Sequence, residues 1–191
     1  THGDPPPPVS GKNVYILDFA YPREILVQMR AEASSLTVLD HHKSTQEALR
    51  GLDFCEFDMN RSGAGMSWDH FNPGKDRPPL VSYVEDRDLW RNSLPWAHEV
   101  TSVLHSYEFS LENWDTLSEK MRYLPDVVAE GSALLRKKEM QVKSTVEAGE
   151  IVSFLGYEVP LVNSRPDHVS DVLNRLAQGH MFAVGWFYSK G

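Results

Sequence analysis

The pattern of apolar and polar residues over the first forty positions predicts a strand, a helix and a second strand. Residues 13–19 and 36–39 are short apolar runs rich in β-branched and aliphatic side chains, which is typical of buried strands. Between them, residues 23–34 carry apolar side chains at helical spacing, and Pro22 lies where a proline is favoured, in a first helical turn. A right-handed crossover makes the two strands parallel, so that their carboxyl ends point the same way.

The rest of the chain continues this mixed pattern. We expect an α/β fold with a parallel-sheet domain and flanking helices at 1–124, a connector helix within 125–149, and an incomplete second α/β domain at 150–191. The connector is the longest helical pattern, at 125–147, and Gly149 ends it. In the first domain we also expect a helix at 45–50 that Ser44 could cap and Gly51 ends, a strand at 53–57, and helices over 91–124 that pack against the sheet. Residues 62–67 are rich in small side chains and predict the start of a closely packed helix. In the second domain we expect strands at 151–155 and 157–162, a helix at 170–178 and a strand at 181–188.

Acidic and imidazole side chains stand where the first two predicted strands end. Asp18 follows the first strand, and Asp40, His41 and His42 follow the second. In an open α/β sheet, ligands gather outside the carboxyl ends of the strands. Carboxylate oxygens and imidazole nitrogens at that edge could hold a divalent metal. Two simpler interpretations stay open: a surface turn that happens to contain two histidines, and a loop or helix-capping role for Asp18.

A third acidic segment, residues 81–90, contains Glu85, Asp86 and Asp88. With the two strand ends, it resembles the motifs of the DHH phosphoesterase family. The segments that resemble the motifs are 16–18, 39–42 and 81–90, and the segments similar to the start of the family's C-terminal substrate domain are 159–164, 171–173 and 182–184. The simpler interpretation of the third segment is that its arginine pairs with a neighbouring acid on the surface.

The resemblance implies a metal centre that holds two divalent ions in the intact protein, Mn²⁺ by preference or Mg²⁺. By this resemblance, Asp18 would bridge the two ions, and His41 would bind one of them through a ring nitrogen. Asp86 would complete the shell of the same ion, with Asp88 as the alternative ligand. The family's first motif would hold the other ion.

The resemblance also implies a reaction, the metal-dependent hydrolysis of phosphodiester bonds. Asp40 would orient a histidine and set its tautomer. His42 would contact the phosphate or donate a proton to the leaving group. By this resemblance, Asp40 and His42 would therefore be catalytic residues rather than metal ligands.

Two motifs of the family have no counterpart in this chain. The first motif is a histidine with two downstream acids after an N-terminal strand, whereas His2, Gly3 and Asp4 stand in front of four prolines with no apolar run before them. The glycine-rich motif with a histidine that is expected near the C-terminus is absent before Lys190 and Gly191. We therefore expect an internal piece of a longer protein, able to bind one ion weakly and poorly active alone.

The net charge bears on the length of the expected substrate. The formal charge is −8 and the basic residues are scattered, whereas a protein that grips a long nucleic acid usually has a basic face. Metal ions can supply local positive charge for a short anionic substrate. We therefore expect a short oligonucleotide or a cyclic dinucleotide. A single-strand exonuclease of the same family and a non-catalytic nucleotide-binding or interaction module stay open as alternatives.

Composition is that of a globular protein, with 41% hydrophobic and 24% charged residues. The sequence contains no run of about 18 apolar residues, so we expect no membrane span. The single cysteine, Cys55, excludes an internal disulfide and favours a cytoplasmic location. We expect Cys55 to be a strand residue rather than a nucleophile. The oligomeric state stays open, with a homodimer as one option.

Overall fold

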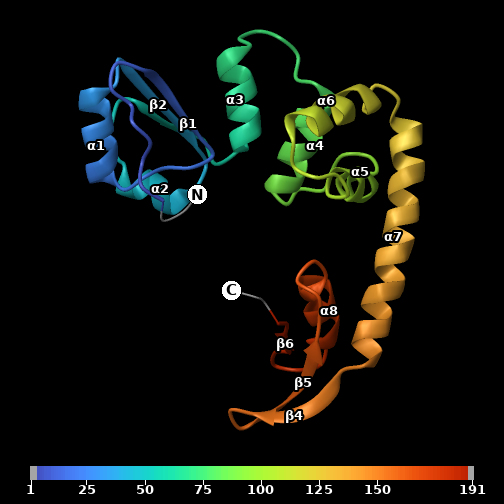
Figure 1. The fold of residues 1–191 in the computed structure, drawn as a ribbon. Helices are drawn as coiled ribbons and strands as arrows, with labels where there is room; N and C mark the ends of the chain where they lie inside the picture. The colour runs from blue at the N-terminus through green and yellow to red at the C-terminus, as the bar shows by residue number, and fades with distance from the viewer. Residues whose placement is uncertain (1–3, 189–191) are drawn as a thin grey trace. The chain divides into compact units, whose positions relative to one another are not determined.

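The computed structural model describes residues 4–188 and has a mixed α/β fold (Figure 1). The chain forms two compact units that divide between Val127 and Val128. Four residues that entered the motif comparison, His2, Gly3, Lys190 and Gly191, lie outside the described residues. Within residues 4–188, no helix has both the length and the apolar character needed to cross a membrane.

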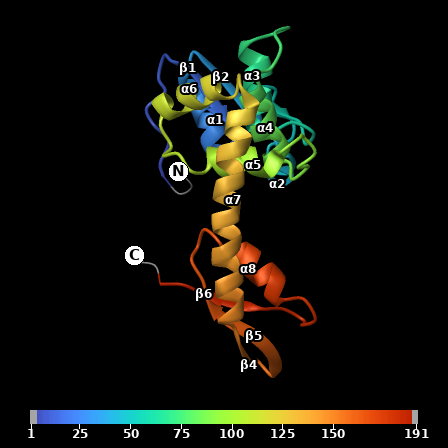
Figure 2. The same ribbon diagram turned by 90° about the vertical axis from the view of Figure 1, so that its right-hand side faces the viewer.

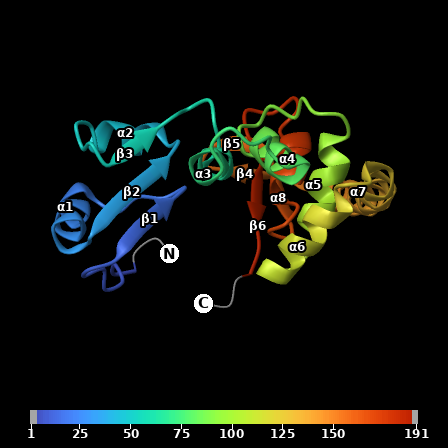
Figure 3. The same ribbon diagram turned by 90° about the horizontal axis from the view of Figure 1, so that it is seen from above.

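The first unit is built on a three-stranded parallel sheet in the order β1-β2-β3. Its strands are β1 (Asn13–Leu17), β2 (Ser35–Asp40) and β3 (Cys55–Phe57), and the helices between them are α1 (Arg23–Glu32) and α2 (Lys43–Ala48). The arrows of β1 and β2 run side by side in the same direction in Figure 3. The strand–helix–strand prediction for residues 13–40 is therefore confirmed, together with its parallel pairing.

Apolar side chains from α1 and the sheet form the core of this part of the unit. Leu26 and Met29 are three residues apart and therefore lie on one face of α1. They belong to one buried cluster with Ile16, Leu36 and Val38 from the strands. Burial of these faces holds the helix on the sheet and thereby sets where the two strand ends lie.

Helices make up the rest of the first unit: α3 (Gly63–Phe71), α4 (Pro79–Asp88), α5 (Ala97–Leu104) and α6 (Leu111–Lys120). α3 contacts β1 and β2, and α4 contacts α3, α5 and α6. Figure 3 shows α3 beside the arrowhead ends of β1 and β2. Helices are confirmed within 91–124, but the expectation that they pack against the sheet is wrong, because α5 and α6 pack mainly against α4.

The prediction that Ser44 caps the next helix is wrong. α2 begins at Lys43, and its N-cap residue is His42, whose side chain makes no capping hydrogen bond. An N-cap residue needs an extended backbone, and His42 has it, with φ −82° and ψ 120°. Ser44 therefore lies inside the first helical turn.

The second unit consists of most of α7 (Leu124–Glu147), followed by β4 (Glu150–Phe154), β5 (Tyr157–Asn163), α8 (Val169–Leu176) and β6 (Val184–Trp186). Figure 2 shows α7 along its length. β4 and β5 form an antiparallel hairpin, and β6 pairs with β5 in parallel. Leu155 and Gly156 both have positive φ in the two-residue turn, as tight hairpins require. Val142, Val162 and Val172 form the buried cluster.

Candidate metal centre

Two neighbouring strand ends position the first side chains of the site. Leu17 of β1 pairs with Leu39 of β2, so that Asp18 and Asp40 follow at adjacent strand ends. The backbone N–H of Asp18 donates to the carbonyl oxygen of Leu39 at 2.8 Å. Asp18 itself adopts the left-handed conformation, with φ 57°, which aspartate tolerates better than most residues. The structure thus places Asp18 and the Asp40–His42 segment on one edge of the sheet.

The imidazole of His41 lies between two carboxylates. Its Nε2 atom is 3.1 Å from Oδ1 of Asp18 and 3.3 Å from Oδ2 of Asp88, at the end of α4. The His41 side chain is 12% exposed, whereas both acids are at least 40% exposed. A nearly buried imidazole nitrogen therefore lies beside two carboxylate oxygens that solvent can reach.

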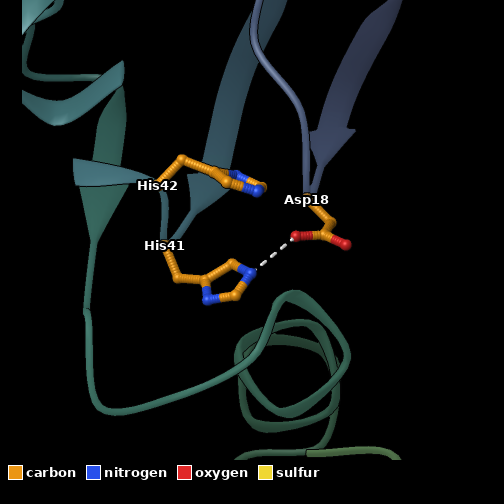
Figure 4. Close-up of side chains that lie close together, drawn as sticks. All are labelled: Asp18, His41 and His42. Atoms are coloured by element: carbon orange, nitrogen blue, oxygen red, sulfur yellow. Dashed lines mark ion pairs between the residues drawn. The ribbon is translucent and has the colours of Figure 1, made fainter. Parts of the chain in front are cut away.

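His42 is directed toward the same place and is held by Asp40. Its Nδ1 atom lies 2.6 Å from Oδ1 of Asp40, which also accepts a hydrogen bond from the backbone N–H of His41 at 2.8 Å. Ligand atoms of Asp18, His41 and His42 all lie within 4.8 Å of one another. Figure 4 shows both rings extending toward Asp18. Because Nδ1 contacts Asp40, Nε2 of His42 is the ring nitrogen that can meet a ligand.

Electrostatics at the site reflect this crowding of acids. Burial raises the pKa of the Asp18 carboxyl above its usual value; the two histidines oppose this rise, and Asp88 and Asp40 add to it. The hydrogen bond with Asp40 raises the pKa of His42, against the effect of burial. A carboxyl whose pKa is raised by burial and by neighbouring acids, as that of Asp18 is, is a group that a bound cation would stabilise in its charged form.

The donor set fits a divalent cation. Carboxylate oxygens together with imidazole nitrogens suit Mn²⁺ and Mg²⁺, although the same donors also bind other divalent metals. Asp40 is completely buried, and its Oδ2 atom has no hydrogen-bond partner among the residues that the structure describes. Buried carboxylate oxygens normally have a hydrogen-bond partner, so Oδ2 of Asp40 has free capacity to bind a cation or a water molecule.

The structure brings Asp88, and not Asp86, to His41. Oδ1 of Asp86 accepts hydrogen bonds from the backbone and hydroxyl of Ser93 at 3.0 and 2.7 Å, and Oδ2 accepts one from the backbone of Leu94 at 3.3 Å. Residues two apart on a helix point in different directions, so only one of the two acids can face the site. Asp86 instead anchors the loop after α4, and Asp88 lies where Asp86 was expected.

The first residue of α3 packs directly against the Asp18 side chain. A Cβ atom on Gly63, the first residue of α3, would lie 2.3 Å from Cβ of Asp18. Ser62 caps this helix, and its hydroxyl accepts a hydrogen bond from the backbone N–H of Gly65 at 3.0 Å. The small residues at 62–67 permit such close packing, but the sequence does not indicate which residue they pack against.

A buried acid joins α4 to the start of α3. Glu85 accepts a hydrogen bond from the backbone N–H of Ser62 at 3.0 Å and one from the Arg77 guanidinium at 2.7 Å. The Glu85 side chain is 10% exposed, and through Ser62 it holds the start of the helix whose first residue packs on Asp18. No local sequence signal identified this role of Glu85, because Ser62 lies 23 residues away along the chain.

Comparison with known proteins finds one similar protein and gives no evidence about function. The chain is 27% identical over 195 aligned residues to the uncharacterized protein R106 of Acanthamoeba polyphaga mimivirus, in an alignment that covers 95% of this chain. The same alignment covers 45% of R106, so the chain spans less than half the length of that relative. No protein-family model matches the chain, and no solved structure matches it.

Proposed function

We propose that this chain forms the metal-binding part of a phosphoesterase of the DHH type, which hydrolyses phosphodiester bonds in short oligonucleotides or cyclic dinucleotides. The observation that supports the proposal most directly is the position of the His41 ring between Asp18 and Asp88, at 3.1 and 3.3 Å. The reaction class comes from the sequence resemblance, and the net charge of −8 favours a short substrate.

In this proposal Asp18, His41 and Asp88 hold one divalent ion, Mn²⁺ or Mg²⁺. The three donors come from β1, from the residues after β2 and from α4, so the folded first unit is needed to assemble them. Such an ion, when bound, would supply charge neutralisation for phosphate oxygens and a hydroxide at neutral pH. The chain itself would position the three ligand atoms and leave one side of the site open to solvent.

His42 is the residue proposed to act on the substrate. Asp40 accepts from its Nδ1, which holds the ring in one orientation. The His42 side chain is 56% exposed, so its Nε2 can contact a phosphate oxygen or donate a proton to the leaving oxygen. Asp40, at 1% side-chain exposure, positions His42 and does not meet the substrate itself.

Metal binding is the first test. Titration of Mn²⁺ into the chain by calorimetry should give one site, and Asp18→Ala and His41→Ala should each weaken binding at least about tenfold. Glu119→Gln is the matched control, because Glu119 forms an ion pair with Arg122 on an exposed surface. Equal affinities in all four proteins would rule out this site.

Hydrolysis is the second test and should use the full-length protein. We expect Mn²⁺-dependent cleavage of a dinucleotide, with a loss in Asp18→Ala and His41→Ala. Equal rates in the wild type and both variants would end the phosphoesterase proposal. Metal-dependent nucleotide binding without cleavage would favour the non-catalytic module, and rates that rise with strand length would favour an exonuclease.

A further inference from the structure

A cavity of about 820 Å³ lies beside the candidate metal centre, within the first unit. Asp18 and Asp88 form part of its wall, and most of the remaining wall comes from α4, α5, α6 and the segment between α5 and α6. Its volume falls in the range of about 300–1,000 Å³ that small-molecule sites occupy. The cavity therefore continues the metal centre instead of forming a separate hollow.

The wall away from the two acids is apolar and aromatic. Leu104 and Leu117 line it from α5 and α6 and are almost completely buried. Phe109 and Trp114 also line it, with ring centroids 5.5 Å apart and ring planes at 79°. Phe109 is 90% exposed. A large aromatic side chain that is open to solvent at a cavity gives a flat ligand a surface on which to stack.

A few polar groups interrupt this apolar wall. The guanidinium of Arg87 lies 4.1 Å from the ring centroid of Trp90, and Arg87 also lines the cavity. The hydroxyl of Tyr107, another lining residue, contacts Nζ of Lys120. Apolar walls with a small number of placed polar groups are the usual composition of a site that orients a bound molecule.

We propose that this cavity binds the base of a nucleotide whose phosphate lies at Asp18 and Asp88. The inference rests on the proposed function and extends it to the substrate's base. Two carboxylates repel a phosphate unless a divalent ion lies between them, so the anionic end of the ligand would be held through the ion of the proposed function. The other end must be flat and apolar to match Phe109 and Trp114, and a nucleotide has both properties. Stacking on aromatic side chains tolerates any base, so binding should depend on the presence of a base more than on its identity.

Three phosphates tested by calorimetry with Mn²⁺ present separate the contributions. Adenosine 5′-monophosphate should bind about tenfold or more tightly than ribose 5-phosphate, which has no base. Hexyl phosphate, which has an apolar chain but no ring, should bind no better than ribose 5-phosphate. Phe109→Ala and Trp114→Ala should remove most of the advantage of the adenosine compound and leave ribose 5-phosphate within about twofold.

Phe71→Ala is the matched control, because Phe71 is a half-exposed phenylalanine outside the cavity wall. It should leave the affinity for adenosine 5′-monophosphate unchanged. The inference is overturned if the wild type binds the adenosine and ribose compounds equally, if hexyl phosphate matches the adenosine compound, or if neither Phe109→Ala nor Trp114→Ala lowers the advantage.

Adenosine without phosphate, titrated without metal, separates this inference from the proposed function. Weak adenosine binding that Phe109→Ala abolishes would support the base site even if Mn²⁺ binding and hydrolysis both failed. Mn²⁺-dependent hydrolysis with no effect of either aromatic substitution would leave the phosphoesterase proposal standing and exclude the base site.

Discussion

Gly63 and Asp18 approach so closely that no side chain fits between them. An added Cβ at Gly63 would lie 2.3 Å from Cβ and 2.7 Å from Oδ1 of Asp18. Asp18 is held by its own backbone hydrogen bond to Leu39, so it cannot easily move away. The position of one candidate metal ligand is thus tied to the first residue of α3.

This contact predicts that Gly63→Ala weakens metal binding although it removes no ligand. Alanine suits a helix better than glycine, so any loss must come from the clash with Asp18. We expect Mn²⁺ affinity to fall at least about tenfold, and stability to fall by about 1–3 kcal/mol from overpacking. Calorimetry and thermal unfolding measure the two effects.

Ser67→Ala on the same helix is the control for Gly63→Ala. The Ser67 hydroxyl donates a hydrogen bond to the carbonyl oxygen of Gly63 within α3, and its loss should not affect metal affinity. If Gly63→Ala and Ser67→Ala bind Mn²⁺ equally well, the contact does not determine where Asp18 lies.

Substitution by asparagine should lower stability at Asp86 and lower Mn²⁺ affinity at Asp88. Asp86→Asn disturbs three hydrogen bonds from Ser93 and Leu94 and should cost about 1–3 kcal/mol of stability, with Mn²⁺ affinity unchanged. Asp88→Asn should weaken Mn²⁺ binding at least about tenfold and leave thermal stability unchanged or higher, because it removes an acid near Asp18. The reverse result would make Asp86 the ligand.

Asp69 predicts a loss of stability in acid. The hydrogen bond from Arg77 is the largest cause that holds the pKa of Asp69 below its usual value of 3.8, and Arg61 adds to it. A carboxyl with a lowered pKa in the folded state contributes stability above the unfolded value, and this contribution is lost as the pH falls through the lower folded value. Because Asp69 is about one-third exposed, the contribution is moderated by solvent.

Urea unfolding between pH 5 and pH 2 (about the range of carboxyl titration) measures this effect. The wild type should lose stability below about pH 4, and Asp69→Asn should be less stable at pH 5 and show a shallower further decline. Glu119→Gln again serves as the control, since it removes an ion pair whose partners are both mostly exposed. A decline in Asp69→Asn as steep as in the wild type would contradict the assignment.

Cys55 should react slowly with alkylating agents. Burial raises the pKa of its thiol to about 11, and Asp53 adds to this while Arg23 opposes it. Only the thiolate reacts, so at pH 8 the rate with iodoacetamide should be about 100-fold below that of an ordinary cysteine. The rate should keep rising to about pH 11. The same protein in urea is the control, because its single cysteine is then solvated; equal rates folded and unfolded would show an accessible thiolate.

Local sequence patterns predicted most of the elements of the fold because each depends on near neighbours along the chain. The apolar run predicted at 13–19, the helical spacing at 23–34 and the second run at 36–39 correspond to β1, α1 and β2, with bounds that differ by one or two residues. The long helical pattern at 125–147 matches α7 to within one residue at its start. Short elements were less well defined: the predicted strand at 181–188 is only Val184–Trp186, because a strand ends where its pairing partner ends.

The sequence by itself determined that Asp18 and the Asp40–His42 segment end two parallel strands, because hydrophobic period and crossover handedness are local properties. Only the tertiary structure decided that Asp88 and not Asp86 meets His41, because this depends on which face of α4 is turned toward His41. It also decided that Gly63 packs on Asp18 and that Glu85 holds Ser62. Such contacts join residues far apart in the chain, and no nearby residue pattern encodes which distant partner a side chain will meet.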